Sequence, residues 1–213
     1  MGSICTYRNI DGLTKFLQVM LGVGLVLAVV SLVSSFLQLE LLARESFTEA
    51  EANANDARES FIGLISILLR LATVVVFGIW IVRANKNVRA LGAVGLRMTP
   101  GWALGYFFVP ILNLFRPYQA MSDLWRASQD PAAWQSVSAS AIVPIWWTLW
   151  IGANIVGQVA FRLGRQADTI EVLKGVTNVE ITATVIDAVL CVVAALLVQG
   201  IATAQKSRMP AMA

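Results

Sequence analysis

The sequence predicts an all-α integral membrane protein with about four transmembrane helices. The chain of 213 residues is 57% hydrophobic and only 14% charged, whereas soluble domains are about 45–50% apolar and about 25% charged. The hydrophobic residues come in blocks long enough to cross a bilayer, which takes about 20 residues in a helix. The Lys and Arg residues stand mainly at the ends of these blocks, which is typical of polytopic membrane proteins.

We place the four spans at residues 16–39, 61–82, 141–161 and 181–204. Each can cross a hydrocarbon core of about 30 Å at a rise of about 1.5 Å per residue. Residues 40–60 are rich in Glu, Ala and Asn and contain no Pro or Gly, so we expect helix to continue there beyond the membrane. No linker indicates a second domain, and we treat residues 1–213 as one polytopic membrane domain.

The stretch 83–130 is predicted to form a cytoplasmic or interfacial module. Arg83, Lys86 and Arg89 follow the second span at helical spacing, and we expect them to form a basic stripe on an extension of that helix. Residues 101–115 are apolar but too few for an ordinary span, and they contain Pro110 and Asn113. Such short runs are more often re-entrant, interfacial or buried than membrane-spanning.

An amphipathic helix is expected directly after this short apolar run, over residues 117–128. Tyr118, Met121 and Trp125 would share one face of it, with Asp123 and Arg126 elsewhere. This pattern predicts a helix that lies in the membrane interface.

The distribution of charge predicts the orientation. With four spans, ten of the sixteen Lys and Arg residues lie on the side that holds both termini, five lie on the other side, and Arg70 lies inside the membrane. If residues 101–115 also crossed the membrane, the split would be nine to six. The positive-inside rule therefore favours four spans with both termini cytoplasmic. All seven Trp residues lie between Trp80 and Trp150, where four spans would place them near the cytoplasmic interface.

The composition gives no support for a metal, cofactor or catalytic site. The chain contains no His, which removes the commonest metal ligand and general base. Cys5 and Cys191 are far apart, so neither a disulfide framework nor a CxxC metal site is expected. Residues 1–6 match a myristoylation pattern, which we attribute to chance. No nucleophile–base motif or phosphate loop is present, so we expect a protein that is not an enzyme and that binds no nucleic acid.

The middle of the chain carries an ordered run of distinctive residues. It reads WIVRANKNVRALG at residues 80–92, LRMTPGWALG at 96–105, VPILNL at 109–114, RPYQAM at 116–121 and LWRAS at 124–128. This run resembles bacterial membrane proteins of the domain of unknown function 4328 family, and the flanking spans match that family in length and character. The resemblance implies a polytopic bacterial membrane protein, located in the plasma (inner) membrane, and it implies no activity.

Two charged residues stand inside the predicted spans. Arg70 lies near the middle of the second span, and Asp187 lies at a similar depth in the fourth. A charge at that depth usually has a partner inside the bundle. Four polar residues lie near the same level and complete a candidate intramembrane cluster: Ser31, Ser35, Asn154 and Gln158. We favour a structural ion pair that fixes helix order over a site for a solute, ion or proton.

The module 83–130 offers the second candidate site. Its basic and aromatic residues suit anionic lipid headgroups or a protein partner. The candidate residues are Arg83, Lys86, Arg89, Arg97, Arg116, Trp125 and Arg126. Ordinary positive-inside anchoring explains the same charges equally well.

The predicted outer loop is acidic, with six carboxylates against Arg44 and Arg58, and we interpret it as a solvated helical face. Taken together, these patterns predict a non-enzymatic membrane subunit, adaptor or lipid-interacting component. Its expected partners are the lipid bilayer, anionic lipids, and either another membrane protein or further copies of the chain. A small transporter or channel that uses Arg70 and Asp187 is the alternative.

Overall fold

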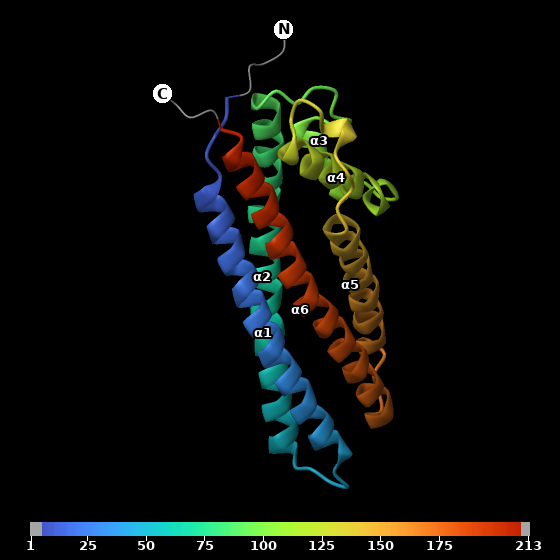
Figure 1. The fold of residues 1–213 in the computed structure, drawn as a ribbon. Helices are drawn as coiled ribbons and strands as arrows, with labels where there is room; N and C mark the ends of the chain where they lie inside the picture. The colour runs from blue at the N-terminus through green and yellow to red at the C-terminus, as the bar shows by residue number, and fades with distance from the viewer. Residues whose placement is uncertain (1–5, 210–213) are drawn as a thin grey trace. The chain divides into compact units, whose positions relative to one another are not determined.

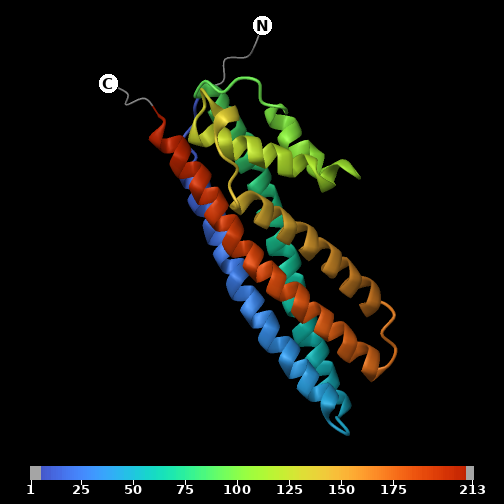
Figure 2. The same ribbon diagram turned by 45° about the vertical axis from the view of Figure 1, so that its right-hand side comes forward.

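The computed structural model describes residues 6–209, and every regular element in that range is a helix. Four of the α-helices are long and two are short, as drawn in Figures 1 and 2. The long helices are α1 (Asp11–Ala43), α2 (Glu49–Ala90), α5 (Ile142–Gly164) and α6 (Ile170–Ser207). Between α2 and α5 come α3 (Pro100–Gly105), α4 (Arg116–Gln129) and three 3₁₀ turns, at Tyr106–Phe108, Leu112–Leu114 and Trp134–Ser136. The all-α fold class is therefore confirmed. Cys5 lies outside the described residues, as does the whole Met1–Thr6 pattern except Thr6.

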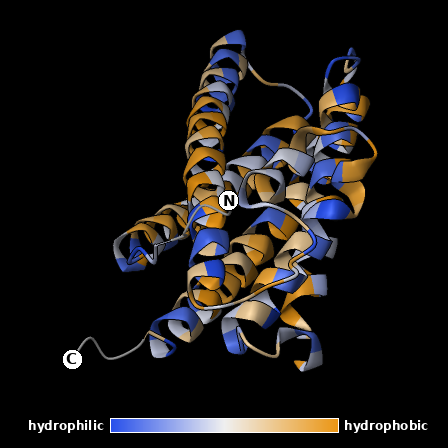
Figure 3. Cartoon of the chain, turned by 90° about the horizontal axis from the view of Figure 1, so that it is seen from above, coloured by the Kyte–Doolittle hydropathy of each residue, from blue (hydrophilic) through white to orange (hydrophobic). Residues whose placement is uncertain are grey.

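All four long helices are long and apolar enough to cross a membrane. Three of them contain a predicted span in full, and α5 contains all of the third span except its first residue, Ala141. Figure 3 colours the chain by hydropathy and shows many hydrophobic residues among the helices. Large apolar side chains stand on their outer surfaces; Val26 is 64% exposed and Phe61 is 65% exposed. Apolar surface of this kind is costly in water and suits contact with lipid tails. The fold is thus compatible with a multi-pass membrane protein.

The ends of α2 follow from local sequence. Thr48 and Glu51 form a capping box, in which Glu51 N–H donates to Thr48 Oγ1 (3.2 Å) and Thr48 N–H donates to Glu51 Oε2 (2.8 Å). Helix therefore does not continue unbroken through 40–60, because α1 ends at Ala43 and α2 begins afresh at Glu49. At its other end, α2 stops at Ala90, and Gly92 just beyond it has a left-handed φ of 102°. Bonds from Gly92 N–H to Arg89 O and from Ala93 N–H to Val88 O complete a Schellman motif.

The described chain forms two compact units, and each long helix contributes residues to both. Unit 1 consists of residues up to 19, residues 73–147 and residues from 193 on; unit 2 consists of residues 20–72 and 148–192. Unit 1 therefore holds α3, α4 and both ends of the described chain. Its core contains side chains with no exposed surface from α2, α4 and α6, among them Trp80, Leu124, Leu197 and Ile201.

The short apolar run forms no continuous helix. Thr99 caps the N-terminus of α3, Pro100 stands in its first turn, and two 3₁₀ turns flank Pro110. Proline has no N–H and disfavours helix in the residue before it, which explains the break at this point. Ile111 has φ of 68°, a left-handed conformation that is strained for a β-branched residue. Phe108 and Ile111 are 70% and 73% exposed, so this segment presents bare apolar surface.

Helix α4 covers the predicted amphipathic stretch, but its buried face differs from the expected one. Ala120, Met121 and Leu124 are buried, while Trp125 is half-buried. Asp123, which the sequence assigned elsewhere, is also buried. The reason is an ion pair inside unit 1, described below, that compensates the carboxylate.

Candidate functional site

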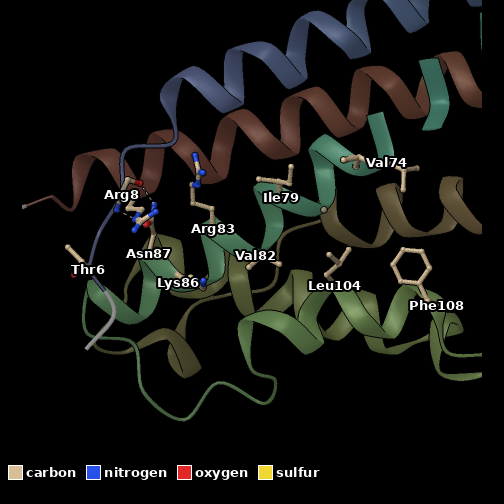
Figure 4. Close-up of a pocket in the computed structure, with 12 residues that line it drawn as sticks. Thr6, Arg8, Val74, Ile79, Val82, Arg83, Lys86, Asn87, Leu104 and Phe108 are labelled. Carbon is tan, nitrogen blue, oxygen red and sulfur yellow. Dashed lines mark hydrogen bonds between the residues drawn. The ribbon is translucent and has the colours of Figure 1, made fainter. Parts of the chain in front are cut away.

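An open groove of about 780 Å³ lies in unit 1, between α2, the N-terminal segment 6–10 and the α3 region. Ligand pockets commonly have volumes of about 300–1,000 Å³. Figure 4 shows that the two ends of the groove differ in character. Arg8, Arg83 and Lys86 stand at one end, while Val74 and Phe108 stand at the other. The groove therefore combines a cationic end with an apolar wall.

Helix α2 supplies most of the residues that line the groove. Apolar and basic side chains follow one another along one of its faces. Val75, Ile79, Val82 and Lys86 recur at intervals of three and four residues, which places them on neighbouring turns of the same face. Gly78 lets the α3 region approach closely, since a Cβ there would stand 3.1 Å from Leu104 Cδ1. The switch from apolar to basic residues along this face produces the two-ended groove.

Asn87 fixes the N-terminal segment to α2. Its Nδ2 donates to Arg8 O (2.8 Å), and Arg8 N–H donates to Asn87 Oδ1 (3.0 Å). Asn87 is fully buried, and Ile10, which belongs to the chain segment that leads into α1, is also buried. Burial also raises the pKa of Tyr7 above its ordinary value, with the Asp11 carboxylate adding to the effect. These contacts bring Arg8 to the groove although it is 79 positions from Asn87 in the sequence.

The three cations of the groove carry uncompensated charge. Among residues 6–209, no Asp or Glu forms an ion pair with Arg8, Arg83 or Lys86. Two other cations of unit 1 do have an acidic partner: Lys206 pairs with Asp11 at 2.7 Å, and Arg97 pairs with Asp123. The groove thus concentrates positive charge next to apolar surface, which is the complement of an amphiphile with an anionic head.

Arg89 and Arg116, which also belong to the predicted lipid- or partner-binding set, make contacts within the protein. Arg89 donates to the Met98 carbonyl, and Arg116 donates to Gln119 Oε1 (3.1 Å) and stands 5.7 Å from the ring centroid of Tyr106. Arg126 is half-buried in the last turn of α4. Of the predicted set, the groove gathers Arg83 and Lys86 only.

Arg97 and Trp125 also have structural partners in unit 1. Arg97 Nε donates to Asp123 Oδ2 (2.8 Å), and its NH2 group donates to Asp123 Oδ1 (2.5 Å). This bidentate bond holds the pKa of Arg97 above its ordinary value, so its charge is permanent in the physiological range. The Trp125 ring packs on Gly200 of α6, where an added Cβ would stand 2.8 Å from Cζ3. A larger side chain at this position would force the Trp125 ring or the α6 backbone to shift.

The second candidate site lies in unit 2. Arg70 of α2 and Asp187 of α6 form an ion pair through Arg70 NH2 and Asp187 Oδ2. The Arg70 side chain is 58% exposed and that of Asp187 is 28% exposed. Their neighbours on the surface are apolar; Leu71 and Val185, for example, are exposed. The pair is therefore a polar point on an apolar surface.

The other four residues of the predicted intramembrane cluster do not join the pair by any hydrogen bond among the described residues. Asn154 Nδ2 donates to Trp150 O on its own helix (2.7 Å). Gln158 is exposed, Ser31 is half-buried and Ser35 is buried. The structure thus brings together two of the six residues.

Comparison with known proteins adds one finding. The model of the family described as Domain of unknown function (DUF4328) matches residues 43–203. The chain belongs to this family. No curated protein and no solved structure matches it. The match extends well beyond the run 80–128 on which the resemblance rested, and it includes α2, α5 and most of α6. The resemblance is therefore confirmed.

The matched region of this DUF4328 chain contains Arg83, Lys86, Asn87 and Phe108. It begins at residue 43, so Arg8 lies outside it. The family region thus carries the α2 and α3 sides of the groove, and the N-terminal segment adds the third cation.

Sequence reasoning missed a buried polar network in unit 2 of this DUF4328 protein. Asn55 Nδ2 donates to Gln38 Oε1 (3.0 Å), and Gln38 Nε2 donates to Thr177 Oγ1 (2.7 Å). Arg58 continues the network, with its NH2 group donating to Asn55 Oδ1 (2.6 Å) and its Nε donating to Ser34 Oγ (2.7 Å). Arg58 therefore takes part in this network of α1, α2 and α6 and is not simply solvated. The only sequence signal was the presence of amides at the ends of apolar blocks.

Proposed function

We propose that this protein is a non-enzymatic component of the bacterial plasma membrane that binds an anionic phospholipid in the groove of unit 1. The observation that carries the proposal is that one open groove contains both an apolar wall and three cations without an acidic partner: Arg8, Arg83 and Lys86. A phosphate head would accept charge-assisted hydrogen bonds from the cations. The acyl chains would cover the apolar side chains of α2 and the α3 region.

The length of the groove along α2 suits a lipid in one leaflet. Val74 and Arg83 are nine residues apart, which is about 14 Å along a helix. One leaflet contributes about half of the ~30 Å hydrocarbon core. With Arg83 at the level of the headgroups, Val74 therefore lies near the middle of the bilayer, and the apolar wall matches the depth of an acyl chain.

The segment 101–115 supports the same placement, and we propose that it enters the membrane from the cytoplasmic side and returns. Trp147 Nε1 donates to Leu114 O (3.0 Å), and Phe107 packs edge-on against Phe77 with ring centroids 6.3 Å apart. Phe77 and Trp147 belong to apolar helices, so these contacts hold the segment against spans. The exposed side chains of Phe108 and Ile111 would then contact lipid tails. Helix α4 follows as an interfacial helix.

The charge distribution supports a cytoplasmic position for the groove and both termini. Ten of sixteen Lys and Arg residues lie on this side in the four-span arrangement. Unit 1 contains both ends of the described chain together with α3 and α4, which agrees with a single side for all of them. The inner leaflet is also where anionic lipids attract basic residues.

A transporter or channel is the second candidate function. The observation in its favour is the Arg70–Asp187 pair, because charged residues within spans commonly mark solute pathways. It ranks second because the two charges satisfy each other and no further described acidic or amide side chain is hydrogen-bonded to them. Uptake that is abolished by Asp187→Asn while the fold survives would support it.

The lipid proposal is tested by neutralising the cations of the groove. The triple variant Arg8→Gln, Arg83→Gln, Lys86→Gln removes three cations of the groove. The control Arg162→Gln, Arg165→Gln, Lys174→Gln makes the same change in net charge within unit 2. Each cation near a membrane surface contributes about 1 kcal/mol to anionic-lipid binding. Retention of phosphatidylglycerol in native mass spectrometry should therefore weaken about hundredfold in the groove variant. Equal retention by the groove variant, the control and the parent protein would contradict the proposal.

A further inference from the structure

We propose that the groove selects lipids whose headgroup carries two phosphates over those that carry one, and that Asn87 creates this preference by positioning Arg8. The inference rests on the proposed function, because it specifies the lipid class for the same groove. Its first basis is the charge balance. A single phosphodiester brings one negative charge to a groove that holds three cations without an acidic partner among the described residues. A second phosphate supplies at least one more.

The cations are also divided between two chain segments. Arg83 and Lys86 are three residues apart on α2, which makes them neighbours on one helix face. Arg8 comes from the N-terminal segment, and Figure 4 shows it beside Asn87 at the cationic end. One phosphate can be held by the α2 pair alone. Arg8 enlarges the cationic end beyond what one phosphate occupies.

Asn87 is a positioning residue in this arrangement. Its amide uses both its donor and its acceptor on the backbone of Arg8, at 2.8 and 3.0 Å. The bonds hold the main chain, so the exposed Arg8 side chain remains available for a ligand. Loss of these bonds would free the segment from α2 at this point and raise the entropic cost of bringing Arg8 to a headgroup. Replacing Asn87 should therefore act on binding in the same way as neutralising Arg8.

The test compares two amphiphiles with the same tail, farnesyl monophosphate and farnesyl diphosphate, on the full chain in mild detergent. The parent protein should bind the diphosphate about fivefold or more tightly than the monophosphate, since one additional cation is engaged. The preference should fall toward one in Arg8→Gln and in Asn87→Ala. The double variant should fall no further than either single one, because both changes remove the same contact. Lys15→Gln, an exposed cation of α1 outside the groove lining, is the matched control and should keep the preference.

The outcomes separate this inference from the proposed function. Equal binding of the two amphiphiles by the parent protein overturns the selectivity and leaves the lipid groove standing. Binding of neither overturns both. Competition by inorganic pyrophosphate at the concentrations that suffice for farnesyl diphosphate would mean that the groove takes free phosphates and not lipids. If Asn87→Ala does not fold, Arg8→Gln still decides the point, because the Arg8 side chain is exposed and its loss leaves the Asn87 bonds intact.

Discussion

The Arg70–Asp187 pair makes a quantitative prediction about stability. Asp187→Asn leaves the Arg70 guanidinium without its carboxylate, and Arg70→Gln leaves the Asp187 carboxylate without its cation. A lone charge at mid-membrane costs about 2.5–3.5 kcal/mol on insertion scales. Because the Arg70 side chain is 58% exposed on the helix surface, it can partly relax toward the interface. We therefore expect each single variant to lose about 2 kcal/mol of folding free energy.

The double variant Arg70→Gln, Asp187→Asn leaves no unpaired charge. Its loss should be smaller than the sum of the single losses by about 1–2 kcal/mol, within the range that contacting residues show in double-mutant cycles. The assay is reversible unfolding in mixed detergent micelles, followed by helical circular dichroism, for the four proteins of the cycle. Losses that add within about 0.5 kcal/mol would refute the contact. They would also remove the basis for a solute site at the pair.

Three further predictions follow from other contacts. Gly200→Ala should destabilise the protein by about 1–3 kcal/mol, because the added methyl group overpacks against Trp125. Gly63→Ala is the control: its methyl group meets open space, so the change should be neutral or stabilising by up to about 1 kcal/mol. Thermal unfolding of both variants tests this, and equal melting temperatures would contradict it. Arg97→Gln should lower stability, because the buried Asp123 carboxylate loses its compensating cation; Arg97→Gln with Asp123→Asn should recover part of the loss, and no recovery would show that the pair is not coupled. Cysteines introduced at positions 94 and 209 should be labelled only from the cytoplasmic side in intact cells, and one at position 47 only from outside; labelling of 94 and 209 from opposite sides would restore a fifth span.

The long helices were predictable because the signal for them is local. Hydrophobic runs of membrane length place the four spans without knowledge of their neighbours. Three lie inside one observed helix each, and the third begins one residue before α5. The ends were less accurate. Residues 40–60 lack Pro and Gly, yet α1 stops at Ala43; the Thr48–Glu51 capping box was the signal that marks the new start.

The site was less predictable because it depends on contacts between distant residues. Arg83 and Lys86 could be selected from their spacing on one helix, but no local pattern connects Arg8 to them. The burial of Asp123 was equally hidden, since it depends on Arg97 from a separate loop. A prediction from helical periodicity places a carboxylate on the solvent-exposed face of a helix when the cation that pairs with it is not known. An ion pair between distant residues reverses that assignment.

The central claim is that an anionic lipid occupies the groove of unit 1, and site-specific photocrosslinking tests it most directly. A photoreactive residue at Ile79 lies in the groove wall, four residues before Arg83. The same residue at Ile145 serves as the control, because it is 50% exposed near the start of α5 and is not part of the groove lining. In vesicles of phosphatidylglycerol and phosphatidylcholine, crosslinks at position 79 should be enriched in phosphatidylglycerol above its share of the bilayer. Arg83→Gln with Lys86→Gln should remove that enrichment, and crosslinks at 145 should follow bilayer composition throughout. Crosslinks at 79 that simply follow bilayer composition in the parent protein would contradict the account.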